Sequence, residues 1–188
     1  KGLRQAIGAY LTYLNSDDLL LPGVIAEIVD YFQQNPQVDL VFGDGRYIDP
    51  HGKLLLAYQS APFNLADCLL NVQKLAQPGT FWRRKVTDQI GLFDETLHYR
   101  MDYDYWIRAA LAGFRVQYVP GELAAYRLHN ESKTVTQRAV FSRDWDVIVQ
   151  RVFERSDLSP DIAGLKTETL ERSDWAMTKL SWLEKRYD

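Results

Sequence analysis

Hydrophobic and polar positions along the chain predict short strands separated by helices. Residues 10–14 form an aromatic and apolar run between polar residues, a pattern that is typical of a buried strand. Apolar side chains recur at helical spacing in residues 22–34, and residues 102–113 are expected to form a second helix. A second buried strand over residues 39–42 is expected to end at Gly43-Asp44-Gly45.

The same alternation continues further along the chain. Residues 47–48 and 54–56 flank a turn at 49–52, which predicts a hairpin. The other predicted elements are a short helix within residues 63–75, a helical turn at 85–90, and two strands at 114–119 and 123–126 around Pro120-Gly121. This pattern predicts an α/β fold.

The C-terminal part of the chain is helical in pattern. Ser159-Pro160-Asp161 is typical of a helix cap and first turn. We expect these helices to pack on the sheet or on another chain, with a homodimer as one form of that contact. Two helical stripes carry the prediction, one of Phe141, Trp145, Ile148 and Val152, and a looser one of Trp175, Leu180 and Leu183.

Composition narrows the class of protein. Of 188 residues, 46% are hydrophobic and 25% are charged, which is typical of a globular protein. The net charge of -3 gives no reason to expect a nucleic acid partner, and no apolar run is long enough for a membrane span. The single cysteine, Cys68, is expected to be a buried inert thiol. We expect a cytoplasmic protein, with peripheral attachment to a membrane as the alternative.

The strongest candidate for chemistry is the segment Asn15-Ser16-Asp17-Asp18, which directly follows the first predicted strand. Ligands of open α/β sheets bind just beyond the carboxyl ends of strands. Two adjacent carboxylates there are suitable oxygen ligands for Mg²⁺ or Mn²⁺. The ordinary alternative is that Ser16 or Asp18 caps the next helix. Since a cap explains one acid and not two, the sequence favours a metal site.

Three other candidates are ambiguous when each is taken alone. Asp102 at a helix start is sufficiently explained as a cap, worth about 1 kcal/mol. Gln77-Pro78-Gly79-Thr80 lets a backbone approach a ligand closely, although an ordinary turn is the simpler explanation. His129 follows a strand and is explained as a hydrogen-bonded polar residue, and His98 is expected to be exposed.

Taken in order, four segments resemble family 2 glycosyltransferases of the GT-A fold. The resemblance covers roughly residues 2–134, so we expect residues 1–134 to be the C-terminal portion of a GT-A domain and 135–188 to be a helical extension. The implied fold is a partial GT-A, a Rossmann-like mixed sheet with flanking helices. The segments are Asn15-Ser16-Asp17-Asp18, Gln77-Pro78-Gly79-Thr80, Met101-Asp102-Tyr103-Asp104 and Arg127-Leu128-His129.

The resemblance implies a role for each matching position. Asp17 is the implied ligand of a divalent metal, supported by Asp18, and His129 adds a ligand or touches the diphosphate. Asp102 is the implied catalytic base, expected to be ionised near neutral pH because a helix N-terminus favours an anion. Asp17 and Asp102 are expected to converge on one cleft. The implied substrate-binding residues are Asn15, Asp44, Gly79, Thr80 and Met101.

Two positions depart from the family pattern. Asn15 stands where the metal motif has its first Asp, which removes one charge, and Met101 stands where a Glu precedes the base. The first departure bears on metal affinity. The second bears on a contact to the acceptor.

The implied reaction is transfer of a sugar, with inversion, from a nucleotide-diphosphate donor to a hydroxyl of a saccharide or other acceptor, with Mn²⁺ or Mg²⁺ as cofactor. In this family the strands that hold the nucleotide precede the metal motif, so we expect the nucleotide-binding half to be missing and this chain alone to be inactive. Two other hypotheses stay open. One is a sugar- or nucleotide-binding module without catalysis. The other, less favoured because the three histidines are scattered, is a metal-dependent phosphohydrolase.

Overall fold

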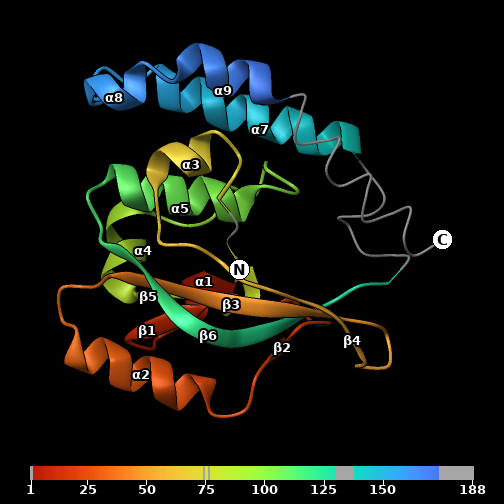
Figure 1. The fold of residues 1–188 in the computed structure, drawn as a ribbon. Coiled ribbons are helices and arrows are strands. Elements are labelled where there is room, and N and C mark those ends of the chain that lie inside the picture. Colours follow the sequence, from red (N-terminus) through yellow and green to blue (C-terminus); the bar gives the residue numbers. More distant parts are fainter. Residues whose placement is uncertain (1, 74, 76, 130–137, 174–188) are drawn as a thin grey trace. The chain divides into compact units, whose positions relative to one another are not determined.

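The computed structural model describes residues 2–73, 75, 77–129 and 138–173, which fall into two units (Figure 1). The sheet unit comprises Lys1–Phe63, Lys74–Leu92 and Arg108–His129. The helical unit comprises Asn64–Gln73, Phe93–Ile107 and Asn130–Asp188. Each unit draws on segments that are far apart in the sequence. The predicted division into residues 1–134 and 135–188 stays a prediction.

The sheet unit is built on one mixed sheet. Within the described residues the strand order is β1-β5-β3-β6-β2, and β4 pairs with β3 beyond the end of β5. β3 and β6 run parallel and the other pairs are antiparallel. The expected mixed α/β class is therefore confirmed. The strands are β1 (Tyr10–Thr12), β2 (Leu19–Leu20), β3 (Leu40–Ile48), β4 (Leu54–Tyr58), β5 (Thr80–Arg83) and β6 (Val116–Arg127).

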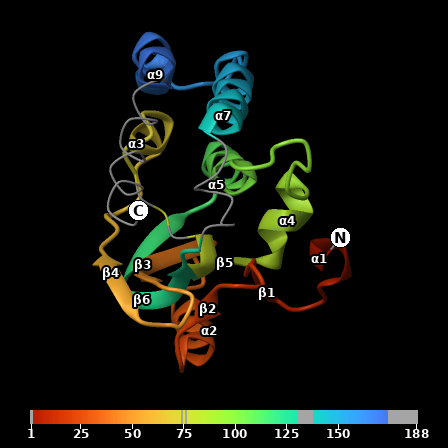
Figure 2. The ribbon, with the colours of Figure 1, turned by 90° about the vertical axis from the view of Figure 1, so that its right-hand side faces the viewer.

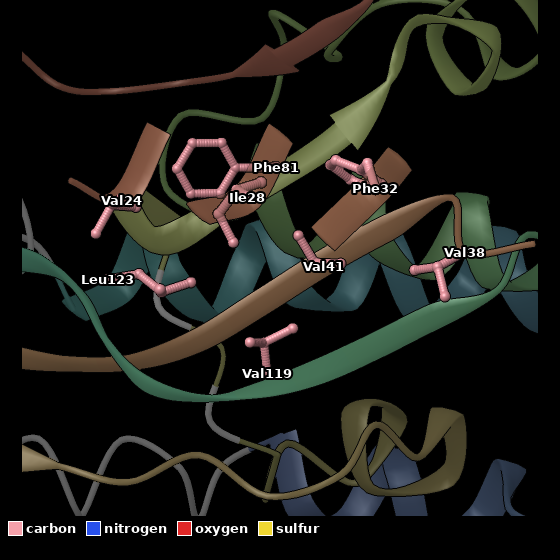
Figure 3. Close-up of a cluster of buried hydrophobic side chains, with 8 residues drawn as sticks. All are labelled: Val24, Ile28, Phe32, Val38, Val41, Phe81, Val119 and Leu123. Carbon is pink, nitrogen blue, oxygen red and sulfur yellow. The ribbon is translucent and has the colours of Figure 1, made fainter. Parts of the chain in front are cut away.

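Helix α2 (Val24–Gln34) packs on one face of this sheet (Figure 3). Val24, Ile28 and Phe32 lie four residues apart, so they share one side of the helix and are all buried. The predicted helix over residues 22–34 is thereby confirmed. The strands contribute Val41, Phe81, Val119 and Leu123 to the same cluster, and Val38 joins it from the connection between α2 and β3.

The predicted end of a strand at Gly43-Asp44-Gly45 is wrong, because β3 continues through these residues to Ile48. The glycines serve close packing within the strand. A Cβ atom on Gly43 would lie 2.5 Å from Leu123 Cγ, and one on Gly45 would lie 2.6 Å from the Tyr58 hydroxyl oxygen. The absence of side chains at these two positions therefore lets Leu123 and Tyr58 pack directly against β3.

The two strands predicted around Pro120-Gly121 are one strand, β6. Gly121 has a φ of 130°, and the β3–β6 register shifts on both sides of Asp44, whose partner is Glu122. Such a shift is typical of a bulge, which bends a strand without ending it. Pro120 and Gly121 therefore interrupt the ladder and do not reverse the chain.

The remaining helices are divided between the two units, and Figure 2 shows them from a second side. On α7, Trp145, Ile148 and Val152 are buried, as the stripe predicted. The side chain of Phe141 and the predicted stripe of Trp175, Leu180 and Leu183 lie outside what the structure describes. In the part of the chain that is described, no helix is long and apolar enough to cross a membrane. The helices are α1 (Gly2–Gln5), α3 (Leu65–Leu69), η1 (Gln77–Gly79), α4 (Arg84–Ile90), α5 (Met101–Leu111), α7 (Arg138–Phe153), α8 (Pro160–Ala163) and α9 (Lys166–Ser173).

The structure also tests the predictions made for Cys68, Ser159 and His98. Cys68 on α3 is fully buried, and burial raises the pKa of its thiol. The Ser159 hydroxyl accepts a hydrogen bond from the Ile162 backbone N–H, so the predicted cap is confirmed. His98 is exposed, as expected.

We expect Gly43→Ala to reduce the free energy of unfolding by about 1–3 kcal/mol, because the new methyl group would also lie 2.8 Å from the Gly121 carbonyl oxygen. Chemical denaturation would measure the change. Gly2→Ala is the control, since a Cβ there meets no atom within 4 Å. Equal stability of the two variants would contradict the packing role of Gly43.

Candidate functional site

The acidic turn lies beside the C-terminal end of β6. β2 pairs antiparallel with β6 so that Leu19 is opposite Ala125. Extending this register from Leu19 back into the turn brings Asp17 alongside Arg127, since antiparallel partners move in opposite directions along the sequence. The two residues are 110 positions apart in the sequence. The pairing of a short strand thus joins the first and last of the four motif segments.

Asp18 is the buried member of the acidic pair, with 4% of its surface exposed. Its Oδ1 accepts the Arg127 backbone N–H at 3.0 Å, and its Oδ2 accepts a hydrogen bond from Asn15 Nδ2 at 2.9 Å. Burial raises the pKa of Asp18, while these two hydrogen bonds oppose the rise. Asp18 therefore ties the turn to β6. Its predicted support of a metal stays a prediction.

The other end of the turn is tied to the segment around Pro78-Gly79. Asn15 Nδ2 also donates to Gln77 Oε1 at 2.9 Å, and Gln77 Nε2 donates to the Tyr13 carbonyl oxygen. Next to them, the Thr12 hydroxyl donates to the Thr80 carbonyl oxygen at 2.8 Å. The structure thus brings the second motif segment to the first.

Asp17 and His129 form the exposed part of this arrangement. Asp17 Oδ2 lies 3.0 Å from His129 Nε2, and their side chains are 38% and 30% exposed. Both can therefore reach a ligand in solvent, unlike Asp18. Two residues that the sequence assigned to one metal site are neighbours in the sheet unit.

The donor types of this pair fit a divalent cation. A carboxylate oxygen and an imidazole nitrogen are both accepted by first-row divalent metals, and Mn²⁺ also takes carbonyl oxygens and water. Asn15 could add such an oxygen, because its known hydrogen bonds use only its nitrogen. Among the residues that the structure describes, no group of three or more His, Cys, Asp or Glu side chains is arranged to hold a metal.

Arg127 is a site residue to which the sequence assigned no role. Its Nε donates to the Asp17 carbonyl oxygen at 3.0 Å. One terminal nitrogen donates to the carbonyl oxygens of Asp49 and Pro50, at 3.0 and 2.9 Å. The guanidinium therefore joins the acidic turn to the β3–β4 hairpin. Its place two residues before His129 was the available signal, but nothing in that spacing reveals which carbonyls it contacts.

Asp102 lies in the first turn of α5, in the helical unit. Its Oδ1 accepts the Tyr103 backbone N–H at 2.8 Å. Burial raises the pKa of Asp102 to about 6, against the lowering effects of this hydrogen bond and of the Arg100 charge. The shift is thus opposite to the one expected from the helix N-terminus alone. At pH 7 the carboxylate is still ionised by roughly ten to one.

The start of α5 is held by aromatic and polar contacts within the helical unit. The Arg100 guanidinium lies 5.4 Å from the Tyr103 ring centroid and 5.1 Å from that of Trp145. One of its nitrogens donates to Asn71 Oδ1 at 2.9 Å. These contacts fix the turn that carries Asp102. Its expected convergence with Asp17 on one cleft stays a prediction.

Asp44 occupies a buried position, with 6% of its surface exposed. Its Oδ1 accepts hydrogen bonds from the Ser60 backbone N–H and the Tyr118 hydroxyl, both at 2.8 Å. Its Oδ2 accepts the Gly121 backbone N–H at 3.2 Å. These bonds give Asp44 a structural role at the β6 bulge, and its predicted contact with substrate stays a prediction.

The other predicted substrate-binding residues differ in exposure. Gly79 and Thr80 are buried where η1 joins β5. Met101 is partly exposed at the start of α5. Their contacts with a ligand stay predictions.

A family model described as glycosyltransferase-like family 2 matches residues 1–157. The chain belongs to this family. The motif segments of the acidic turn, Gln77–Gly79, α5 and His129 all fall within the matched residues. The resemblance found in the sequence is therefore confirmed at the level of the family.

Two curated relatives carry glycosyltransferase names. The uncharacterized glycosyltransferase MJ1057 of Methanocaldococcus jannaschii is 24% identical over 140 residues, which are 73% of this chain and 48% of that protein. The uncharacterized glycosyltransferase YwdF of Bacillus subtilis is 27% identical over 128 residues, 63% of this chain and 45% of that protein. The glycosyltransferase chain thus spans about half the length of the curated relatives it matches.

Solved structures confirm the GT-A class of fold. Residues 1–349 of TarS from S. aureus superpose with a TM-score of 0.60 at 16% identity, covering 91% of this chain and 47% of that one. A further TarS structure, with a TM-score of 0.57 at 18% identity and covering 89% and 46%, contains UDP. The mannosyltransferase PcManGT from Pyrobaculum calidifontis, in complex with GDP-Man and Mn²⁺, gives 0.61 at 14% identity and covers 96% and 50%.

We expect Asp102→Asn to change how stability depends on pH. Because the pKa of Asp102 is about 6 in the folded protein and its ordinary value is 3.8, this group favours folding below pH 3.8 and loses that contribution as pH rises through 6. As the pH rises from 4 to 7.5, the free energy of unfolding of the variant relative to wild type should therefore increase by on the order of 2 kcal/mol.

Urea denaturation across this pH range would measure the effect. Asp161→Asn is a matched control, since Asp161 lies exposed in the first turn of α8. A difference between Asp102→Asn and wild type that stays constant with pH would contradict the raised pKa.

Proposed function

We propose that the protein transfers a sugar, with inversion, from a nucleotide-diphosphate donor to an acceptor hydroxyl, and that the reaction depends on a divalent metal. The observation that carries this proposal is the Asp17–His129 pair, which lies at the family's metal motif in a chain of glycosyltransferase-like family 2. UDP in TarS and GDP-Man with Mn²⁺ in PcManGT support a nucleotide-sugar donor. The identities of the sugar and the acceptor stay open.

Asp102 acts as the general base in this proposal. The acceptor oxygen forms a bond to the anomeric carbon, and the bond from that carbon to the diphosphate oxygen breaks with its electron pair. The acceptor proton passes to the Asp102 carboxylate. A pKa of about 6 suits this task, because the group is ionised at neutral pH and is a stronger base than an ordinary aspartate.

Asp17 and His129 are the proposed metal-holding residues, and Asn15 is a further candidate through its side-chain oxygen. A bound Mn²⁺ or Mg²⁺ would offset the charge that develops on the departing diphosphate. Asp18 and Arg127 keep the turn in place. Asp18 accepts hydrogen bonds from the Arg127 backbone and the Asn15 side chain, and the Arg127 side chain donates to the Asp17 carbonyl oxygen. The predicted cytoplasmic location and homodimer stay predictions.

A binding module without catalysis is the second candidate. One observation favours it: the position of the first acid in the metal motif holds Asn15, whose nitrogen is bonded to Asp18 and Gln77. The turn therefore carries one carboxylate fewer than the family pattern. Saccharide or nucleotide binding that is indifferent to Mn²⁺, together with no sugar transfer, would select this candidate.

We expect Asp102→Asn to abolish sugar transfer while donor binding stays within about twofold, because the amide cannot accept the acceptor proton. In the wild-type protein, kcat should fall about tenfold per pH unit below pH 6, since protonated Asp102 is inactive as a base. Nucleoside diphosphate release from candidate nucleotide sugars, measured on the full-length protein, would give kcat, and Asp161→Asn would be the control. Normal turnover by Asp102→Asn would refute the base assignment.

We expect Asp17→Asn and His129→Ala each to weaken Mn²⁺ binding by roughly tenfold or more, since each removes one of the few metal ligands proposed here. Titration calorimetry with Mn²⁺ would measure the affinity, and EDTA should stop transfer by the full-length wild-type protein. Asp88→Asn, which changes an exposed carboxylate on α4 of the same unit, is the control. Unchanged Mn²⁺ affinity in both site variants would exclude this pair as the metal site.

A further inference from the structure

The side chain of Gln77 lies at a junction between two motif segments. Gln77 begins η1, directly before Pro78-Gly79, and its amide faces the end of β1. Its Nε2 donates to the Tyr13 carbonyl oxygen and its Oε1 accepts from Asn15 Nδ2. One partly buried side chain therefore holds both the backbone that enters the acidic turn and the first residue of that turn.

These contacts decide which kind of side chain can occupy position 15. Asn15 Nδ2 has two hydrogens, and it donates to Gln77 Oε1 and to Asp18 Oδ2, both at 2.9 Å. A carboxylate at position 15 would place an acceptor against these two acceptors. Asn15, which stands where the family has an acid, thus supplies the hydrogen-bond donor that Gln77 Oε1 accepts.

The turn that carries Asp17 is held at both ends by this arrangement. At its start, Gln77 binds Asn15, and the Asn15 carbonyl oxygen accepts the Asp18 backbone N–H at 3.3 Å. At its end, Asp18 Oδ1 accepts the Arg127 backbone N–H. Asp17 lies between these two anchors, with its carboxylate next to His129.

We propose that Gln77 is a positioning residue that, through Asn15, holds Asp17 in the orientation in which it binds the metal. This inference rests on the proposed metal-dependent function. Residues that hydrogen-bond and orient metal ligands typically change affinity 10- to 100-fold when they are replaced. Gln77 acts less directly than such residues, because it orients the turn and not the ligand atom itself. We therefore expect a change in metal affinity at the lower end of that range.

The chemistry of a side-chain amide suits both contacts of Gln77. Gln77 must donate toward the Tyr13 carbonyl and accept from Asn15. A side-chain amide carries both functions on adjacent atoms, whereas a carboxylate has no donor and an ammonium has no acceptor. Gln77→Met is therefore the informative change, because it keeps the length of the side chain and removes both functions.

The first test is titration of Mn²⁺ into the purified protein. We expect Gln77→Met to weaken Mn²⁺ binding about tenfold and Asn15→Ala to weaken it at least as much, because Asn15 also bonds to Asp18. The double variant should be no weaker than Asn15→Ala alone, since that change already removes the hydrogen bond through which Gln77 acts. Gln117→Met is the matched control, because Gln117 lies in the same unit and its side-chain nitrogen donates to the carbonyl oxygen of the neighbouring Tyr118, away from the turn. It should stay within twofold of wild type.

A general loss of structure would not give this pattern. If Gln77 positions the turn, saturating Mn²⁺ should return turnover of Gln77→Met to within about twofold of wild type, because the metal itself restores the geometry of its ligands. Wild-type Mn²⁺ affinity in Gln77→Met, or losses that multiply in the double variant, would overturn the proposal.

The second test does not depend on the metal. Hydrogen–deuterium exchange of the backbone amides of residues 15–18 and of Arg127 should accelerate about fivefold or more in Gln77→Met and not in Gln117→Met, since one or two hydrogen bonds that hold the turn are lost. If the wild-type protein binds no Mn²⁺, the metal part of the proposed function fails, and exchange alone decides the role of Gln77. Unchanged exchange at the turn would overturn that role.

Discussion

The short antiparallel pairing of β2 with β6 is the constraint from which the geometry of the acidic turn follows. Only Leu19 and Leu20 form β2, yet their register against Ala125 and Ala124 fixes what lies beside the preceding turn. The parallel pairing of β6 with β3 in turn holds β6 beside the central strand of the sheet. A turn close to one end of the chain is thereby set against a residue 110 positions later. Proximity of the first and last motif segments is a property of the sheet.

Much of the fold could be predicted from the sequence, because amphipathic helices and buried strands have periods that do not depend on distant residues. The exceptions were glycine and proline. Gly43 and Pro120-Gly121 predicted breaks, since these residues usually end strands. In the structure Gly43 makes room for Leu123 and Gly121 lies in a bulge. Whether a glycine ends a strand or permits close packing depends on the residue opposite it, which the local sequence does not contain.

The candidate site could be predicted only in part, because the local sequence does not contain the long-range contacts of its residues. Asp17 and His129 came from the order of the family's motifs, and the structure brings them to 3.0 Å from each other. Gln77 and Arg127 stood within the same motif segments but received no role. Their contacts are to backbone carbonyls and to Asn15, which depend on strand register and on side-chain reach. No pattern of residue types encodes these quantities.

Two adjacent acids in this turn have acquired different environments, and this difference gives them different capacities. Asp18 is buried, its pKa is raised by desolvation, and each of its oxygens already accepts a hydrogen bond. Asp17 is partly exposed beside an imidazole. With Asn15 in place of a third acid, the charge available to a ligand is concentrated on Asp17. The turn thus gives its two acids different surroundings: the inner carboxylate and its amide partner stabilise the backbone, and the outer carboxylate stays accessible to solvent.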